Sequence, residues 1–195
     1  MYLAIHIPDF AVAAVIRSSP DAISRPFAVL DGKGRGEIPE KLPILALNDR
    51  AREAGIEKGC PLNRALVRCP DLKVFPRNVP AEAVLCDDLV RMAELLGPDV
   101  EITRSDVVIL DLSTRKHPLG HILNALELNN CSLWHAQAPT PDLAHMAATH
   151  ASTAGQVITP QELASLPLEI LASVATGSDL MERLSGLEVS TAAIS

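Results

Sequence analysis

The chain opens on a short strand pattern that ends abruptly, and this feature constrains the fold more than any other. Apolar side chains alternate with other side chains over residues 2–7, which is the period of a strand with one face in a core. Pro8 has no N–H to donate to a sheet, so it ends the strand. Asp9 then stands where it would cap a helix. A strand that ends in polar residues at such a turn is a common place for functional side chains, and His6 is the candidate here.

Length and composition leave room for one sizeable core built from aliphatic side chains. The chain has 195 residues, of which 48% are apolar and only 3% aromatic. No apolar run approaches the length of a membrane span, and the chain does not start with a basic segment followed by an apolar one. We therefore expect neither a span nor a signal peptide. The chain has four cysteines and no Cys-x-x-Cys pair, which argues against a zinc site or a disulfide framework. We therefore expect reduced thiols, as in a cytosolic protein, at Cys60, Cys69, Cys86 and Cys131.

Charge is distributed unevenly along a chain whose net charge is −7. Residues 10–79 hold 12 of the 17 Lys and Arg residues but only 8 of the 24 Asp and Glu residues. The remainder holds 5 basic and 16 acidic residues. This asymmetry indicates a basic module in an acidic scaffold. Chance clustering on solvated helices explains the same distribution, so charge alone leaves both interpretations open.

The basic stretch has the pattern of a small α/β unit inserted after the first strand. Asn48 is expected to cap one of its helices. A glycine-rich loop at 32–36 has two cations, but no Gly-Lys-Ser/Thr follows, which argues against a nucleotide-binding loop. A hairpin loop that meets a phosphate backbone fits better. The expected elements are strands at 27–30, 44–47 and 74–75 and helices at 49–54 and 61–68.

The longest amphipathic segment follows this unit. Apolar residues recur at helical spacing over 79–96, which predicts a helix that packs on a core. The order of elements predicts an α+β fold with helices on one face of a largely antiparallel sheet. Short helical pieces after residue 157 lack a partner, so we expect a module that is cut short. The other expected elements are strands at 100–103, 107–112 and 132–134 and helices at about 118–128 and 141–150.

Five motifs follow one another in a recognisable order. They are Ile5-His6-Ile7-Pro8-Asp9-Phe10, Arg25-Pro26-x-Ala28-Val29, Asn48-x-x-Ala51-Arg52-x-x-Gly55-Ile56-x-x-Gly59-x-Pro61, Cys69-Pro70-x-Leu72 and residues 106–113. Together they resemble the palm and fingers of Y-family translesion DNA polymerases. In particular they are similar to the ImuB branch, the catalytically silent members of bacterial mutagenesis cassettes. The resemblance covers about residues 1–190.

The resemblance implies a ferredoxin-like palm at 1–9 and 80–160, fingers at 10–79 and the start of an incomplete thumb at 161–195. It implies a role in DNA repair and translesion synthesis during damage-induced (SOS) mutagenesis, in the bacterial cytoplasm at the nucleoid. The implied partners are primer–template or damaged DNA, a RecA-like accessory protein, an error-prone polymerase and the sliding clamp. Thumb and little finger supply much of the family's grip on DNA, so this length of chain is expected to bind DNA weakly.

An active member of the family holds two Mg²⁺ ions on three carboxylates, one on the first strand and an adjacent pair on a later hairpin. Here the corresponding residues are His6, Asp106 and Val107. A neutral imidazole is a poor Mg²⁺ ligand and valine is none. The resemblance therefore implies a vestigial site without catalytic residues or bound metal. We expect His6 and Asp106 to hydrogen-bond or ion-pair, and a His6 that points to solvent is the alternative.

The family's triphosphate-binding positions are eroded as well. Its Tyr-x-x-Arg aligns with Asp49-x-x-Arg52, where the acid would repel phosphate, so Asn48 and Arg52 are a remnant of this site. Its Asn-Lys aligns with Thr140-Pro141, so a phosphate-binding lysine is gone. Cations of the fingers remain as candidates for DNA contact, namely Lys33, Arg35 and Lys41.

Three functions remain in consideration. The first, which we favour, is a non-catalytic homologue that binds primer–template DNA, recruits partner proteins and needs no cofactor. The second is a residual or divergent nucleotidyltransferase, which would need Mg²⁺. The third is a protein-interaction module without DNA contact. A metal site at His117 and His121 is disfavoured, because no third ligand accompanies this pair.

Overall fold

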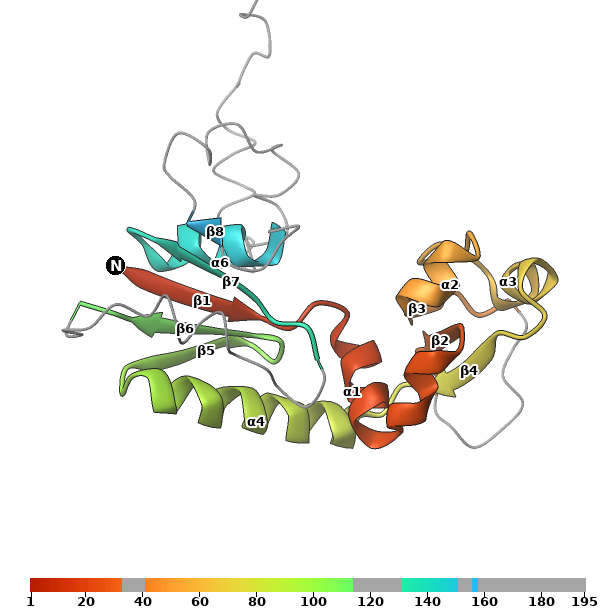
Figure 1. Cartoon of the computed structure of the whole chain (residues 1–195), viewed down its shortest axis with the longest axis horizontal. Helices are drawn as coiled ribbons and strands as arrows, with labels where there is room; N and C mark the ends of the chain where they lie inside the picture. Colours follow the sequence, from red (N-terminus) through yellow and green to blue (C-terminus); the bar gives the residue numbers. More distant parts are fainter. Residues whose placement is uncertain (33–40, 114–130, 151–155, 158–195) are drawn as a thin grey trace, which may run out of the picture.

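The structure is a computed structural model and describes residues 1–32, 41–113, 131–150 and 156–157. Two sheets organise these residues (Figure 1). The large sheet contains, in spatial order, β5 (Val100–Arg104), β6 (Val107–Asp111), β1 (Tyr2–His6), β7 (Trp134–Ala138) and β8 (Gln156–Val157). The small sheet contains β3 (Ile44–Leu47), β2 (Phe27–Leu30) and β4 (Lys73–Pro76).

The large sheet is largely antiparallel, as the sequence predicts. Strand β1 lies in its centre and runs antiparallel to β6 and β7, and β5 runs antiparallel to β6. Strand β8 joins the edge parallel to β7. In the register between β1 and β6, His6 lies opposite Val107 and Leu3 lies opposite Leu110. This pairing brings the end of β1 to the start of β6, where the candidate site lies.

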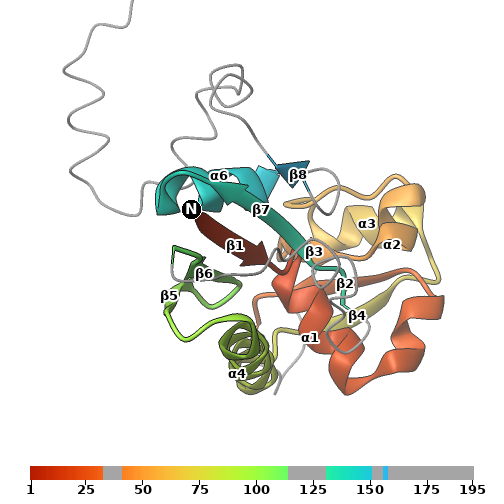
Figure 2. The same ribbon diagram turned by 60° about the vertical axis from the view of Figure 1, so that its left-hand side comes forward.

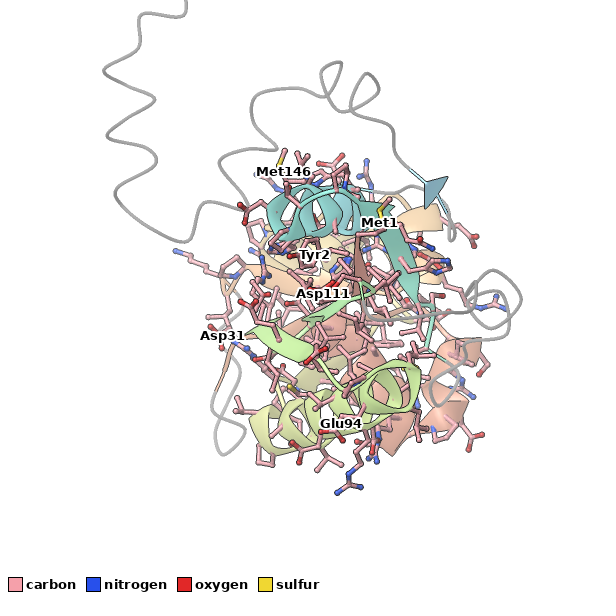
Figure 3. The ribbon with its side chains drawn as sticks, turned by 90° about the vertical axis from the view of Figure 1, so that its left-hand side faces the viewer. Met1, Tyr2, Asp31, Glu94, Asp111 and Met146 are labelled. Atoms are coloured by element: carbon pink, nitrogen blue, oxygen red, sulfur yellow. The ribbon has the colours of Figure 1, made fainter. Side chains whose placement is uncertain are left out.

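Helices cover both faces of the large sheet, so the prediction that they lie on one face is wrong. The longest helix, α4 (Val79–Leu96), packs with Leu3, Ile5 and Ile7 on one face. Helix α6 (Pro141–His150) packs with Ala4 and other small residues on the opposite face. Figure 3 shows Met146 of α6 and Glu94 of α4 on either side of the sheet, with Tyr2 and Asp111 between them. The physical reason is that β1 buries side chains on both faces of the sheet. On the second face the residues are small alanines, which let α6 approach closely.

The small sheet carries its own core. Strand β2 pairs antiparallel with β3 and parallel with β4. Two short helices, α2 (Asp49–Glu53) and α3 (Leu62–Arg68), pack on it near the positions that the sequence predicts. The buried cluster that joins them includes Leu30, Leu47, Ala51, Leu62 and Ala65.

Helix α1 (Phe10–Ser18) stands between the two sheets (Figure 2) and belongs to both cores. Its Ala13 and Ala14 are buried in the cluster that contains α4 and the large sheet. Its Val12 and Val15 are buried with strands of the small sheet. A 3₁₀ helix, η1 (Pro20–Ser24), then leads into β2. The first helix is therefore more than the start of an inserted unit, because it also fixes that unit to the large sheet.

Several expectations concern features around these cores. Cys60, Cys69 and Cys86 are free thiols. Among the described helices, none is both long and apolar enough to cross a membrane. The helix expected at 118–128, the pieces after residue 157 and most of the loop at 32–36 lie outside the described residues.

Candidate functional site

The three positions that are predicted to correspond to metal-binding carboxylates lie together at one end of the large sheet. His6 ends β1, Val107 begins β6, and Asp106 lies in the turn between β5 and β6. The N–H of Ile7 donates a 2.9 Å hydrogen bond to the Asp106 carbonyl, which fixes this turn to β1. The Nε2 of His6 lies 3.5 Å from Oδ2 of Asp106, so the expected juxtaposition is present. Val107 is fully buried.

Arg104 also engages Asp106, and the sequence analysis did not identify this residue. Its Nε donates to Oδ1 of Asp106 at 3.0 Å and its Nη2 donates to Oδ2 at 3.2 Å. Burial alone would raise the pKa of Asp106, but the hydrogen bond with His6 and the charge of Arg104 outweigh it, so this pKa lies below its usual value. Both carboxylate oxygens are thus occupied by partners of the chain itself. The sequence signal that could have predicted this contact is the Arg-x-Asp spacing in the tight turn between the two strands.

The His6 side chain is enclosed, which excludes the alternative that it simply points to solvent. Only 12% of it is exposed, and its ring stands edge-on to Trp134 with centroids 5.8 Å apart. Its Nδ1 is buried without a hydrogen-bond partner among the described residues. His145 of α6 is likewise buried, and its Nε2 has no partner there. Burial chiefly lowers the pKa of His145, with a further contribution from nearby Arg104.

These residues do not fit a pair of Mg²⁺ ions. Mg²⁺ prefers oxygen ligands in octahedral geometry, and bridging two ions takes several carboxylates. The site offers one carboxylate, which Arg104 already neutralises, together with an imidazole and a valine. Across the part of the chain that the structure describes, no group of three or more His, Cys, Asp or Glu side chains could hold a metal ion.

Asp9 does not cap α1 through its side chain, contrary to the prediction. It occupies the N-cap position with φ 48° in the left-handed region, and its carboxylate makes no cap hydrogen bond. Its Oδ2 instead accepts a hydrogen bond from Nη2 of Arg52 at 2.5 Å. The Nη1 of Arg52 donates to Asp49 at 2.9 Å. Burial would lower the pKa of Arg52, but the two carboxylates outweigh it and raise this pKa. Asp9 and Asp49 thus neutralise the charge of Arg52, which the family resemblance assigns to phosphate binding.

Asn48 caps α2 as predicted, but its whole side chain is used within the protein. Its Oδ1 accepts hydrogen bonds from the N–H groups of Ala51 at 3.1 Å and of Phe27 at 2.9 Å. Its Nδ2 donates to the Arg25 carbonyl at 2.8 Å. These bonds tie α2 to the start of β2. A structural role accounts for Asn48, so its assignment to a nucleotide-binding remnant is not needed.

The remaining candidate positions lie only partly within the described residues. Lys41 is exposed shortly before β3, while Lys33 and Arg35 lie outside the described residues. At the start of α6, Thr140 Oγ1 accepts a hydrogen bond from the Leu143 N–H at 3.4 Å, so the threonine serves the helix end. The structure therefore brings His6, Asp106 and Val107 together.

A cleft of about 650 Å³ lies between the large sheet and the small sheet, and the His6–Asp106 pair lines one of its walls. Leu45 and Ala46 of β3 line another part of it, so the cleft spans both sheets. Cationic side chains also reach it, namely Lys58, Arg77 and Arg104. Of these, Arg77 pairs with the buried carboxylate of Glu82, from which its Nη2 lies 2.8 Å away.

Comparison with solved structures agrees with this architecture. The chain is similar to Dbh DNA polymerase in an insertion ternary complex, with a TM-score of 0.71 and 20% identity over 96% of this chain and 57% of that one. It is also similar to DinB from Sulfolobus solfataricus, with a TM-score of 0.68 and 19% identity over 95% of this chain and 57% of that one. The predicted likeness to the palm and fingers of Y-family polymerases is thereby confirmed at the level of the fold.

Sequence comparison points the same way. DNA polymerase IV of Actinobacillus pleuropneumoniae serotype 5b (strain L20) is 25% identical over 93% of this chain and 53% of the relative. DNA polymerase IV of Ralstonia nicotianae is 30% identical over 53% of this chain and 28% of the relative. The chain thus spans at most about half the length of these relatives. The model of the IMS (impB/mucB/samB) family matches residues 5–149, and the chain therefore belongs to this family of Y-family polymerase domains.

Proposed function

We propose that this chain is a non-catalytic Y-family homologue that binds primer–template DNA and recruits other proteins during translesion synthesis. The observation that carries the proposal is the state of Asp106, the one acid left at the metal-binding positions. Arg104 contacts both of its oxygens and His6 lies 3.5 Å from one of them. The negative charge of Asp106, which would otherwise attract a metal ion, is already neutralised by an ion pair with Arg104.

The chemistry of phosphoryl transfer explains why the loss is decisive. Catalysis there depends on metal ions and cations that neutralise charge as it develops on the triphosphate and on the attacking oxygen. Removal of one such stabilising group typically costs about 10²–10³ in rate. This chain lacks two of three carboxylates, and Asp9 and Asp49 balance the charge of Arg52. The combined loss leaves no useful polymerase activity.

The DNA-binding part of the proposal rests on the fold and on the distribution of charge. Relatives with this architecture are DNA polymerases by name, and one similar structure is titled an insertion ternary complex. We propose that residues 1–9 and 80–160 form the palm, 10–79 the fingers and 161–195 the start of a thumb. A RecA-like protein, an error-prone polymerase and the sliding clamp are the proposed partners, at the bacterial nucleoid. A place in the ImuB-like branch would account for this combination.

A primer-extension assay with Mg²⁺ or Mn²⁺ tests the loss of catalysis. We expect no templated extension by the chain, and any extension that Asp106→Ala abolishes would overturn the proposal in favour of a residual nucleotidyltransferase. Binding of primer–template DNA at increasing salt tests the other part. The logarithm of the binding constant should fall linearly with the logarithm of salt concentration. An absence of binding even at low salt would leave the protein-interaction module.

Restoring acids at positions 6 and 107 gives a complementary test of whether the present residues have lost the ability to bind Mg²⁺. The double variant His6→Asp, Val107→Glu should be destabilised without metal, because it buries unpaired carboxylates. Mg²⁺ should then raise the melting temperature of this variant but not that of the wild type. The matched control His6→Asn, Val107→Gln has similar shapes without the charges and should show no such rise. A rise of the same size in the wild type would contradict the proposal.

A further inference from the structure

Strand β5 forms one edge of the large sheet (Figure 2), and no described strand pairs with its outer side. Two of its side chains are open to solvent as well, because Glu101 is exposed and 55% of Ile102 is exposed. None of the residues 99–102 lines the cleft, so this edge is separate from the vestigial site. An uncovered edge of this kind can pair with an added strand.

The register between β5 and β6 identifies the backbone groups that this edge leaves free. In an antiparallel ladder, residues that exchange hydrogen bonds with the neighbouring strand alternate with residues whose N–H and C=O groups point the other way. The Asp111 N–H donates a 3.1 Å hydrogen bond to the Asp99 carbonyl, and Glu101 follows two positions later on β5. Asp99 and Glu101 therefore direct their backbone groups toward β6, whereas the N–H and C=O groups of Val100 and Ile102 point outward.

An added strand on this edge would meet two different surfaces, because successive side chains of a strand point to opposite faces of a sheet. Ile102 shares one face with Val100, which packs against the core that contains α4. Asp99 and Glu101 share the other face, and both are exposed. Residues 92–103 hold three acids and no Lys or Arg, so no cation of this segment balances them. The edge thus offers an apolar contact on one face and negative charge on the other.

A second copy of this chain fits the edge poorly. In a two-fold symmetric, antiparallel arrangement, the outward-pointing residues pair as Val100 with Val100, Val100 with Ile102, or Ile102 with Ile102. The first places Asp99 opposite Glu101 and the second places Glu101 opposite Glu101, and like charges in opposed positions destabilise a sheet. The third extends the pairing past Ile102, where the register with β6 is irregular. A strand of opposite charge from another molecule fits better.

We propose that the β5 edge binds an extended basic segment of a partner protein, which adds a strand to the large sheet. In an antiparallel arrangement, the partner residues opposite Val100 and Ile102 exchange backbone hydrogen bonds with them and present apolar side chains. The alternate residues present Lys or Arg to Asp99 and Glu101. The segment is therefore recognised by its alternation of apolar and cationic residues. The inference rests on the proposed recruitment of partner proteins, for which it names the surface and the class of segment.

The backbone part of the proposal is tested with a short peptide in which Val and Lys alternate. NMR titration of the isotope-labelled 195-residue chain should shift the amide signals of Val100 and Ile102 and give a Kd. N-methylation of every valine of the peptide removes the N–H groups that would bond to the edge, so it should abolish these shifts. N-methylation of every lysine leaves those groups in place and should preserve binding.

The charge part is tested with variants of the edge. The double variant Asp99→Asn, Glu101→Gln keeps the shapes of the two side chains but removes their charges. It should weaken binding of the peptide by about three- to tenfold and make binding less dependent on salt. The matched control is Glu57→Gln, Asp71→Asn, because it removes two exposed acids from the small-sheet unit. This control should bind the peptide as the wild type does.

Equal binding of the two N-methylated peptides would indicate general charge attraction and overturn the inference, as would equal losses in the edge variant and its control. A dimer in analytical ultracentrifugation that Ile102→Pro converts to a monomer would assign the edge to a second copy and overturn it as well. If the chain binds primer–template DNA but not the peptide, the inference fails while the proposed DNA binding stands. If it binds the peptide but not DNA, the inference stands while the proposed DNA binding fails.

Discussion

The Nε2 of His6 lies 3.5 Å from Oδ2 of Asp106, at the positions where the family resemblance predicts a vestigial metal site. Arg104 approaches the same carboxylate from the other side. An imidazole and a guanidinium thus meet the one remaining acid of the site. The end of β1 and the turn before β6 are joined by the His6–Asp106 pair and by the hydrogen bond from the Ile7 N–H to the Asp106 carbonyl.

Asp106→Asn should lower the free energy of unfolding at pH 7 by about 1 kcal/mol, since Arg104 is 42% exposed and solvent screens much of the pair. The folded-state pKa of Asp106 lies below its unfolded value of about 3.9. Its contribution is therefore complete above about pH 5 and is lost as the pH falls through the folded pKa. Urea denaturation at pH 7 and pH 3 measures this difference, which should shrink at pH 3. The exposed variant Asp71→Asn serves as a control, and a difference that persists unchanged in acid would contradict the prediction.

His145→Leu should make stability less dependent on pH. Burial lowers the pKa of His145 in the folded state, so the unfolded chain takes up the proton first as the pH falls below about 6.5. This histidine therefore costs stability on acidification, with a limiting slope of about 1.4 kcal/mol per pH unit. The leucine variant should show a flatter profile between pH 7 and pH 5 in thermal or chemical denaturation. Met146→Leu changes the same helix without removing a titratable group and should keep the wild-type slope.

Asn48→Ala should destabilise the chain by about 2–4 kcal/mol, because it removes a helix cap and leaves the Phe27 N–H and the Arg25 carbonyl without their partner. Asn48→Asp keeps the two accepted hydrogen bonds and loses the donated one, so its loss should be smaller. Chemical denaturation orders the two variants. Equal losses would show that the accepted bonds contribute little, against the structural role assigned to Asn48.

The sequence predicts the elements that depend on local patterns. The helix expected at 79–96 is α4, and the helix expected at 141–150 is α6. Their apolar periodicity and their Pro and Gly boundaries are local signals, so no tertiary information was needed. The cap at Asn48 was predictable for the same reason. The order of the motifs also sufficed to place His6 beside Asp106, because the strands that carry them are neighbours in the family's fold.

The errors concern contacts between distant segments. Alternation along β1 identifies one apolar face, but Ala4 does not reveal that α6 covers the other face. Asp9 has the residue type of a helix cap, yet the position of Arg52, 43 residues later in the chain, decides where its carboxylate points.

Helix α1 has a consequence for how the chain unfolds. Its alanines are buried beside α4 and its valines beside the small sheet, so neither core can open fully while α1 stays in place. Arg17 adds a link, with its Nη2 2.7 Å from Asp88 on α4. The two sheets therefore share one cooperative transition, and the small-sheet unit has a fixed direction relative to the large sheet. If DNA binds in the cleft as we propose, it would meet a surface whose shape is set before binding.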